Sequence, residues 1–340
     1  MPLSLWIRPL PIIFFIDKMY THKPQQDSND INLTMIRKFI SFAAGWRTGT
    51  AEEYSACYHR YGGSFVTHPD VLSFMQRQFN LSHKYYIKRA ANRELIGGLC
   101  INDNKEIAIV GKRSKALGLD RFPFNKDEMI LPISEQVKTV IPYRSKILSS
   151  INGRSVLNST FSLNSHREIC LAKSCGKGGF SSSTKNSRNR ELKKFLKSGG
   201  EAVEQSQLTP AQLVDIYFDL HGKRWGKDPG NQSQMLAMLT DLRDMIFGYV
   251  LFYHGKPCAY QLITKTESPR WICFDYVNGG YDRQHDEFCP GTIVTWLNVR
   301  AAYELCEQAG KEMRYSFGKP TAAYKDRWCK RAPLGRTLAI

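Results

Sequence analysis

Trp271-Ile-Cys-Phe-Asp-Tyr-Val277 reads as a strand, and it opens the stretch of sequence that decides the fold. A polar loop leads from it to Pro290-Gly291-Thr292 and to a helical pattern that ends at Gln308. A basic strand, Arg314-Tyr-Ser-Phe-Gly-Lys319, follows. This order aims the amides at the start of the helix, with their positive dipole end, into a cleft between two neighbouring strands. The stretch therefore predicts a place to hold an anion.

Upstream of this unit, the sequence shows two further passes of helix followed by strand. We expect helices at residues 50–75 (broken at Gly62-Gly63), 188–197 and 210–225. We expect strands at residues 85–99 (two strands around a turn), 107–110, 247–253 and 257–264. The two hairpins resemble each other, which indicates an internal duplication at the scale of a domain.

The predicted division of the chain follows from these passes. We expect an N-terminal extension at 1–34, a first α/β domain at 35–155, and a second domain at 156–340 that carries the cleft. A Ser-, Asn- and Gly-rich segment at 145–183 lies between the halves and predicts a loop or mobile crossover.

Composition places the chain among basic globular proteins. It has 340 residues, of which 42% are hydrophobic, and 48 Lys and Arg against 31 Asp and Glu give a net charge of +17. A chain of this length can bury a large core. The charge indicates polyanions as partners.

The nine cysteines form no C-x-x-C pair and mostly fall inside apolar patterns, which is typical of reduced, buried thiols. Cys170 and Cys175 with His166 come nearest to the ligands of a zinc site. A second pair of ligands is missing, so we expect no metal. Cys289 precedes a helix N-terminus, where a thiol pKa is lowered, but closeness to His285 in the sequence sets no triad geometry. We therefore favour a structural thiol over a nucleophile.

The N-terminal apolar run Leu3–Ile16 is interrupted by Arg8, Pro9 and Pro11 and is too short to span a membrane. Two interpretations stay open. The protein starts at Met35 and the run is not part of it, or the run lies in a membrane interface.

A strongly basic helix is predicted after a Gly- and Ser-rich approach. Residues 165–200 hold nine Lys or Arg and two Glu, and the glycines do not match a P-loop. A solvated helix face and an anion-binding surface are both open, and the +17 charge favours the second. The candidate anion-binding residues are Lys185, Arg188, Arg190, Lys193, Lys194 and Lys197, with Arg224 on the next helix.

The start of the 290–308 helix and the basic tail are the other candidate sites. Gly291 permits close approach of a phosphate to the backbone, although many helices begin with Pro-Gly and bind nothing. Residues 311–336 hold eight Lys or Arg against two acidic residues, and Gly318-Lys319-Pro320 predicts a donor-rich turn. No DNA-binding helix pair or RNA-binding aromatic motif accompanies them, so we expect no DNA partner.

Taken in order, these pieces resemble the acyltransferase superfamily of the N-acetyltransferase fold, in the two-domain form that includes the peptidoglycan aminoacyl transferases. The residues that carry the resemblance are Ser187-Arg188-Asn-Arg190, Lys197-Ser-Gly-Gly200, Leu220-His-Gly-Lys-Arg-Trp225, Pro290-Gly291, Phe317-Gly318 and Tyr324-Lys325. Over its whole length the chain is similar to the macrophage-inducible antimicrobial-peptide-resistance proteins of enteric bacteria.

The resemblance implies an α/β (α+β) fold of tandem N-acetyltransferase-like domains, the first degenerate, with mixed, splayed β-sheets flanked by helices. An acyl or aminoacyl donor then lies between two parted strands, with Asp275 as the candidate catalytic residue. The implied donor-binding residues are Gly291, Thr292, Phe317, Gly318, Lys319, Tyr324 and Lys325.

The chain departs from the family in its pyrophosphate loop. Coenzyme A users of this fold carry R/Q-x-x-G-x-G/A, of which only Pro290-Gly291 remains. Acyl-coenzyme A and aminoacyl-tRNA both stay open as donors, and so does a non-catalytic scaffold with a degenerate acyltransferase fold.

The resemblance also implies a role in resistance to cationic antimicrobial peptides. A basic chain is poorly suited to capture cationic peptides, because like charges repel, so modification of an envelope component is favoured over sequestration. Anionic lipid attracts Lys and Arg, which predicts peripheral association with the cytoplasmic face of the inner membrane.

Overall fold

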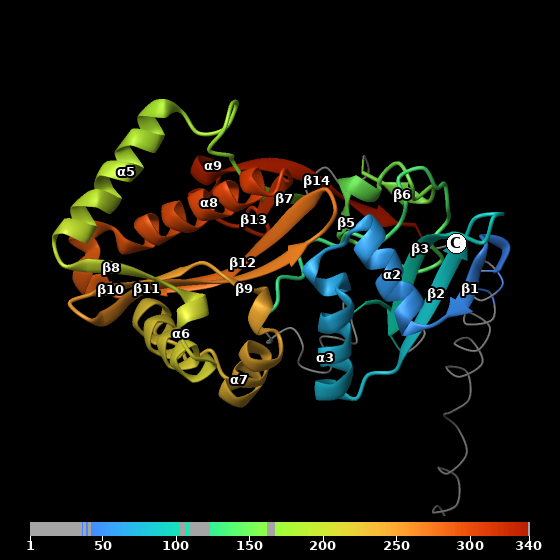
Figure 1. Cartoon of the computed structure of the whole chain (residues 1–340), viewed down its shortest axis with the longest axis horizontal. Helices are drawn as coiled ribbons and strands as arrows, with labels where there is room; N and C mark the ends of the chain where they lie inside the picture. The colour runs from blue at the N-terminus through green and yellow to red at the C-terminus, as the bar shows by residue number, and fades with distance from the viewer. Residues whose placement is uncertain are drawn as a thin grey trace, which may run out of the picture.

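Two β-sheets, each with its own helices, build this protein (Figure 1). The structure is a computed structural model, and it describes residues 36, 39, 42–102, 106–108, 123–161 and 167–338. The apolar run Leu3–Ile16 and Met35, on which the two interpretations of the N-terminus depend, lie outside the described residues. We call residues 42–161 the first half of the chain and 167–338 the second half.

The first half holds a four-stranded antiparallel sheet in the order β1-β2-β3-β4. Its strands are β1 (Trp46–Gly49), β2 (His83–Arg89), β3 (Leu95–Asn102) and β4 (Glu106–Ile107), and the described part of this half has the helices α2 (Ala51–Tyr61) and α3 (Pro69–Phe79). Helix α2 begins where Thr50 and Glu53 form a capping box, and α3 begins with Pro69 after the His68 cap. Helix α2 ends at Tyr61, and Gly62 forms its C-cap at φ 78°, so the break predicted at Gly62-Gly63 is present.

The second sheet runs in the order β5-β14-β7-β13-β12-β11-β10-β8. Its strands are β5 (Leu148–Ser149), β6 (Ser159–Thr160), β7 (Glu168–Ala172), β8 (Gly200–Glu204), β9 (Ile246–Phe247), β10 (Tyr249–Tyr253), β11 (Lys256–Glu267), β12 (Trp271–Tyr281), β13 (Glu312–Ser316) and β14 (Cys329–Thr337). The helices of the second half are α5 (Ser182–Lys197), α6 (Pro210–Trp225), α7 (Gln232–Asp241), α8 (Pro290–Gln308) and α9 (Lys325–Trp328).

Strands β12 and β13 pair in parallel over only part of their length. Their register runs from Trp271 opposite Glu312 to Asp275 opposite Ser316, and β12 then continues alone on this side to Tyr281. The register of β12 with β11 shifts at this point, where Val277 is an extra residue. A bulge bends a strand and increases its twist, so Val277 supplies a physical reason for the parting.

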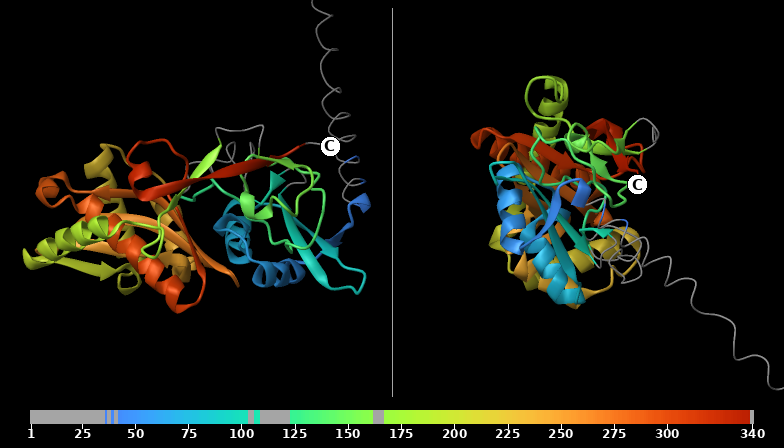
Figure 2. Two further views of the ribbon diagram at one scale, coloured as in Figure 1. Left: turned by 90° about the horizontal axis from the view of Figure 1, so that it is seen from above. Right: turned by 90° about the vertical axis from the view of Figure 1, so that its right-hand side faces the viewer.

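The two faces of the sheet are covered differently. Helix α8 packs on one face, where Ile272 and Phe274 join Trp296 in a buried cluster. Helix α6 and the first half cover the other face, where Trp271 and Cys273 pack against Ile130 (Figures 1 and 2). Because side chains alternate along a strand, Asp275 points to the same face as Cys273, away from α8.

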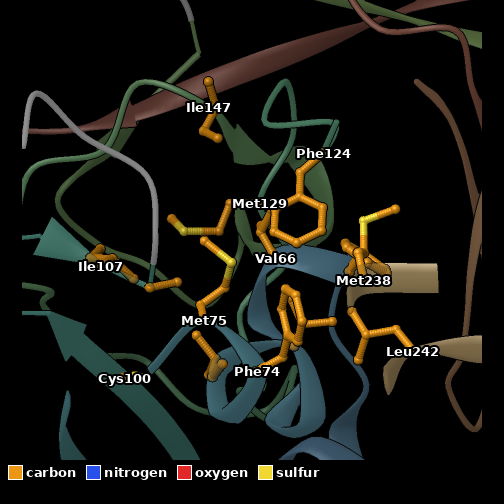
Figure 3. Close-up of a cluster of buried hydrophobic side chains, with 14 of the residues drawn as sticks. Val66, Phe74, Met75, Cys100, Ile107, Phe124, Met129, Ile147, Met238 and Leu242 are labelled. Carbon is orange, nitrogen blue, oxygen red and sulfur yellow. The ribbon is translucent and has the colours of Figure 1, made fainter. Parts of the chain in front are cut away.

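The core of the first half continues into the second half. Figure 3 shows Met238 and Leu242, from the end of α7, beside Phe74 of α3 and Phe124. Arg77 of α3 also pairs with Asp241 of α7 at 3.2 Å. The two halves therefore share buried apolar surface, and the domain division at residue 155 remains a prediction.

The predicted helices at 210–225 and 290–308 have the same bounds as α6 and α8. The predicted hairpins correspond to β2-β3 and β10-β11. The prediction of a loop over 145–183 was wrong. This segment contains β5, β6 and β7, and all three pair with β14 at the C-terminal end of the chain. Strands this short leave little periodicity, because partners far away in the sequence stabilise them.

Candidate active site

A cleft of about 570 Å³ opens where β12 and β13 part. Its walls come from the free end of β12, the first turn of α8, the end of α6 and the segment that includes α9. Gly279 and Gly280 lie in this end of β12, and a Cβ at Gly280 would lie 2.5 Å from the Leu220 carbonyl oxygen of α6. The glycine pair thus allows α6 to approach the parted strand closely.

The predicted opening is therefore present, and Trp296 does not fill it. Trp296 is buried one turn further along α8 than Thr292, where its ring meets Phe180 edge-on at 5.6 Å and its Nε1 donates to Asn189 Oδ1 at 2.9 Å. The residues that line the cleft are Arg224, Trp225, Tyr260, Gln261, Tyr276, Gly279, Gly280, Tyr281, Asp286, Cys289, Gly291, Thr292, Val294, Thr295, Tyr324, Arg327 and Trp328.

The first turn of α8 offers fewer free amides than its sequence predicts. Thr292 and Ile293 both donate their backbone N–H to the Cys289 carbonyl, at 2.8 and 3.2 Å, and Pro290 has no N–H. Within the described part of the chain, the Gly291 amide has no hydrogen-bond partner. A single free amide can bind one anionic oxygen but cannot cradle a pyrophosphate.

Two arginine side chains line the cleft. Arg224 lies 4.8 Å from the ring centroids of both Trp225 and Tyr281, a cation–π arrangement that holds its head group in place. Arg327 lines the cleft from α9. Among the described residues, neither guanidinium pairs with a carboxylate, and Asp286 is the acidic side chain in the lining. The cleft therefore combines positive charge with aromatic walls, which suits an anion attached to a planar group.

Asp275 lies at the last register of the parallel pair, one residue before the lining residue Tyr276. It does not line the cleft, because its carboxyl group faces the first half of the chain. There Asn125 Nδ2 donates to Asp275 Oδ1 at 3.0 Å and to Ser316 Oγ at 3.2 Å. The carboxylate thus sits on the opposite face of the sheet, at the inner end of the opening.

The pKa of Asp275 is raised to about 7, first by burial and then by the nearby charge of Glu128. The hydrogen bond from Asn125 and the charge of Arg314 act in the opposite direction. Arg314 forms a two-point ion pair with Glu128, in which Nε donates to Oε2 at 3.0 Å. A carboxyl group with a pKa near neutrality can exchange a proton at physiological pH, as a general base must.

The structure brings together four of the sequence-predicted donor residues. Gly291, Thr292 and Tyr324 line the cleft, and Phe317 packs edge-on against Tyr276 at 5.3 Å between ring centroids. These positions agree with a role in donor binding, which stays a prediction.

The other three predicted donor residues are engaged elsewhere. The ammonium of Lys325 donates to the carbonyls of Phe317 and Lys319, at 2.7 and 2.6 Å, and so closes its own loop. Lys319 pairs with Asp127 at 2.8 Å, outside the cleft. Gly318 adopts φ +70°, where a Cβ would lie 2.5 Å from Asp127 Oδ2. We therefore place these residues in the support of the β13 loop.

Helix α5 presents its predicted cations unequally. Lys185 donates to the Cys175 carbonyl at 3.1 Å, and Arg188 pairs with Glu191. Arg190, Lys193, Lys194 and Lys197 are exposed and, among the described residues, have no acidic partner. Figure 1 shows α5 at the end of the molecule opposite to the first half. Its free cations are therefore accessible to a large polyanion.

The predicted thiols divide into buried and exposed. Cys170 is buried in the α8 cluster and Cys175 is partly buried, and no metal-holding group of side chains occurs among the described residues, which exclude His166. Cys289 is exposed at the cleft, where Sγ donates to the Asp286 carbonyl at 3.5 Å. His285 packs against Tyr253 at 4.9 Å between ring centroids, and within the described residues it forms no hydrogen bond with the thiol.

Sequence reasoning missed Asn125, Arg327 and the aromatic walls formed by Trp225 and Tyr281. The signal that could have located the walls is Gly279-Gly280, since two glycines inside a strand mark a bulge or a close backbone approach. No local signal marks Asn125, because its partners are 150 and 191 residues away.

A protein-family model described as Mig-14 matches residues 68–337. The chain belongs to the Mig-14 family. This confirms the family predicted from the sequence. Among curated proteins, nothing matches this Mig-14 chain.

Solved structures with a similar fold include FemX, which is 8% identical, with 86% of this chain and 97% of FemX covered and a TM-score of 0.54. At this identity the likeness shows the fold alone. The predicted fold class is confirmed as an α/β fold of mixed, splayed β-sheets flanked by helices, similar to the fold of FemX.

Two further structures have lower TM-scores. One is L-PGS from Bacillus licheniformis, with 9% identity, 86% of this chain and 93% of that chain covered, and a TM-score of 0.44. The other is the C-terminal domain of a putative lysylphosphatidylglycerol synthetase from Agrobacterium fabrum, with 13% identity, 85% and 92% coverage, and a TM-score of 0.41.

Among the helices of the described residues, none is both long enough and apolar enough to cross a bilayer.

Proposed function

We propose that this Mig-14 family protein transfers an acyl or aminoacyl group to an amine or hydroxyl of an envelope component, and that this change protects the cell from cationic antimicrobial peptides. One observation carries the proposal. Strands β12 and β13 part after Asp275 and Ser316, and a cleft of about 570 Å³ opens beside the start of α8. The FemX-like fold is consistent with it but does not specify the reaction.

In the proposed reaction, the donor lies in the cleft with its carbonyl group at the inner end, near Tyr276 and Phe317. The amine or hydroxyl of the acceptor attacks this carbonyl carbon, forming a new C–N or C–O bond. The bond from the carbonyl carbon to the leaving oxygen or sulfur breaks, and a proton returns to that atom. Asp275 takes the proton that the acceptor loses.

The donor-binding residues would act through charge and stacking. Arg224 and Arg327 would pair with donor phosphates, the Gly291 amide would donate to one phosphate oxygen, and Tyr281 would pack against a planar ring. Because one free amide replaces a full pyrophosphate loop, we favour aminoacyl-tRNA over acyl-coenzyme A as the donor.

The acceptor is proposed to lie at the cytoplasmic face of the inner membrane. A net charge of +17 favours peripheral binding to anionic lipid. Addition of an aminoacyl group makes an envelope component less negative, and cationic peptides then bind the envelope more weakly.

Mass spectrometry of lipid and cell-wall extracts tests this function. Cells that carry the protein should contain an envelope component heavier by one acyl or aminoacyl group, which cells without it lack. Cells with and without the protein could differ in peptide resistance while their extracts contain the same components. That result would favour the alternative of a non-catalytic peripheral membrane scaffold.

The free cations of α5 give a separate prediction about a polyanionic partner. Replacing Lys193, Lys194 and Lys197 with Ala should weaken tRNA binding. The slope of log affinity against log salt concentration should become less steep by about two to three, because fewer counterions are released. Filter binding across a salt series measures this slope. Replacing Lys185 and Arg188 is the matched control, since both are engaged within the protein.

The same variants distinguish RNA from a membrane surface. Sedimentation with vesicles that contain anionic lipid should weaken with salt as charges are screened. If the α5 variant binds tRNA as the unaltered protein does but loses vesicle binding, α5 contacts lipid, and the tRNA prediction is wrong.

A further inference from the structure

We propose that Asn125, which belongs to the first half of the chain, is a positioning residue that orients the Asp275 carboxylate at the point where β12 and β13 part. The inference rests on the proposed function, since it gives Asp275 the role of a proton acceptor. It adds that the first half completes the site of the second half.

Asn125 lies at the point where the two strands part. Its side chain is buried, and its Nδ2 lies 3.0 Å from Asp275 Oδ1 and 3.2 Å from Ser316 Oγ. Asp275 and Ser316 face each other in the last register of the parallel pair. One amide group therefore links the two strands at the residue pair after which they separate.

The orientation of this amide is settled by a third contact. The backbone N–H of Asp127 donates to Asn125 Oδ1 at 2.9 Å. A backbone N–H can only donate, so the oxygen must face Asp127 and the NH₂ group must face Asp275. The hydrogen bond to Asp275 is thus a donation to its carboxylate, which favours the ionised form.

The segment that carries Asn125 is fixed to β13 and to the loop after it. Glu128 pairs with Arg314, whose guanidinium also donates to Ser149 Oγ at 3.3 Å. Asp127 accepts from the backbone N–H of Lys319 at 3.2 Å and pairs with its ammonium. These anchors hold Asn125 in place, as a positioning residue requires.

The hydrogen bond leaves one carboxylate oxygen available. Within the described residues, Asp275 Oδ2 has no hydrogen-bond partner, whereas Oδ1 is occupied by Asn125. Fixing Oδ1 limits rotation of the carboxyl group, so Oδ2 is the oxygen that can take a proton from the acceptor.

The charges near Asp275 come from the Asn125 segment and from β13, and they set the direction of its titration. Glu128 and Asp127, on the Asn125 segment, raise its pKa, and Arg314 on β13 lowers it. Tyr58 on α2 and Cys273 on β12 are also near, and burial raises the pKa of each, so both are neutral around pH 7. Loss of Asn125 removes a group that lowers the pKa of Asp275.

The test is a ¹³C NMR titration of the Asp275 carboxyl group in the full-length protein, assigned by comparison with Asp275→Asn. In Asn125→Leu, the midpoint should move about one pH unit higher, because a hydrogen bond to the ionised carboxylate is lost. Asn125→Asp, which keeps the shape but places an acceptor beside the carboxylate, should also raise it. A midpoint unchanged in both folded variants would overturn the proposal.

The matched control is Asn152→Leu. Asn152 is likewise a buried amide of the first half, and it bonds to the backbone N–H and C=O of Leu131, at 2.8 and 3.0 Å, without contact to Asp275. Its loss should leave the Asp275 midpoint in place, and a shift as large as that of Asn125→Leu would contradict a specific role for Asn125.

Transfer assays separate this inference from the proposed function. Asn125→Leu should lower kcat about tenfold at pH 7 and leave the KM for the donor unchanged. If neither the unaltered protein nor any variant shows transfer, the proposed function is refuted. If Asn125→Leu still shifts the Asp275 titration in that case, the positioning role of Asn125 is supported.

Discussion

Asp275→Asn should lower the rate of transfer by about 10² to 10⁴, the usual contribution of a general base. An Asn side chain has nearly the shape of Asp and can still accept the hydrogen bond from Asn125, but it cannot take a proton. The rate at which the mass-shifted envelope component appears after induction measures the effect. Donor binding should be retained, because Asp275 does not line the cleft.

Asp241→Asn is the matched control for this prediction. Asp241 is a carboxylate of α7 that pairs with Arg77, away from the cleft. The control should transfer at the rate of the unaltered protein. If Asp275→Asn is folded and transfers equally fast, Asp275 is not the base.

The pH dependence of the rate has a definite sign. Because the pKa of Asp275 is about 7, the carboxyl group is protonated at lower pH and cannot act as a base, so the rate should rise between pH 6 and 8.

The stability of the fold should change with pH in the opposite direction. The folded pKa exceeds the unfolded value of about 3.9, so the contribution of Asp275 to stability is lost as pH rises through 7. Asp275→Asn should abolish this loss.

Gly291→Val should weaken donor binding by about tenfold to a hundredfold, the equivalent of one lost hydrogen bond to a charged group. A Cβ at Gly291 would already lie 3.0 Å from Cδ1 of Tyr281, and the Val methyl groups would occupy the cleft wall beside the free amide. Calorimetric titration with the donor measures the loss. Peptide resistance should fall with it.

Two variants show whether the cleft or only its packing is affected. Gly222→Val changes a helical glycine of α6 that has open space around it, and it should bind donor normally. Adding Tyr281→Ala to Gly291→Val relieves the crowding of the ring. Because Tyr281 itself is proposed to bind the donor, Tyr281→Ala alone is the reference for the double variant. If Gly291→Val causes no further loss of donor binding in the Tyr281→Ala background, Gly291 serves packing and its amide does not bind the donor.

Sequence reasoning located the strand, helix and strand of residues 271–319 because each signal there is local. The apolar strand, the Pro290-Gly291 turn and the helical spacing up to Gln308 lie within one continuous stretch, and the structure retains them as β12 and α8. The family resemblance then supplied the parting of the strands, which no periodicity shows.

The features that sequence reasoning missed depend on distant partners. Strand β7 is short, and β14 pairs with it about 160 residues further along the chain. The bulge at Val277 is visible only in its register against β11. Asn125 looks like an ordinary loop residue until the fold brings it to Asp275. Such long-range contacts determine the site, so the helices were easier to predict than the chemistry.

The central claim is that the parting between β12 and β13 holds the donor, and alkylation of Cys289 tests it most directly. Cys289 is exposed at the cleft, whereas Cys175 is partly buried outside it, and the other seven thiols are buried. With aminoacyl-tRNA or acyl-coenzyme A present, peptide mapping should show at least about tenfold slower reaction of Cys289 with iodoacetamide and an unchanged rate at Cys175. A donor that supports transfer but leaves the Cys289 rate unchanged would contradict the account.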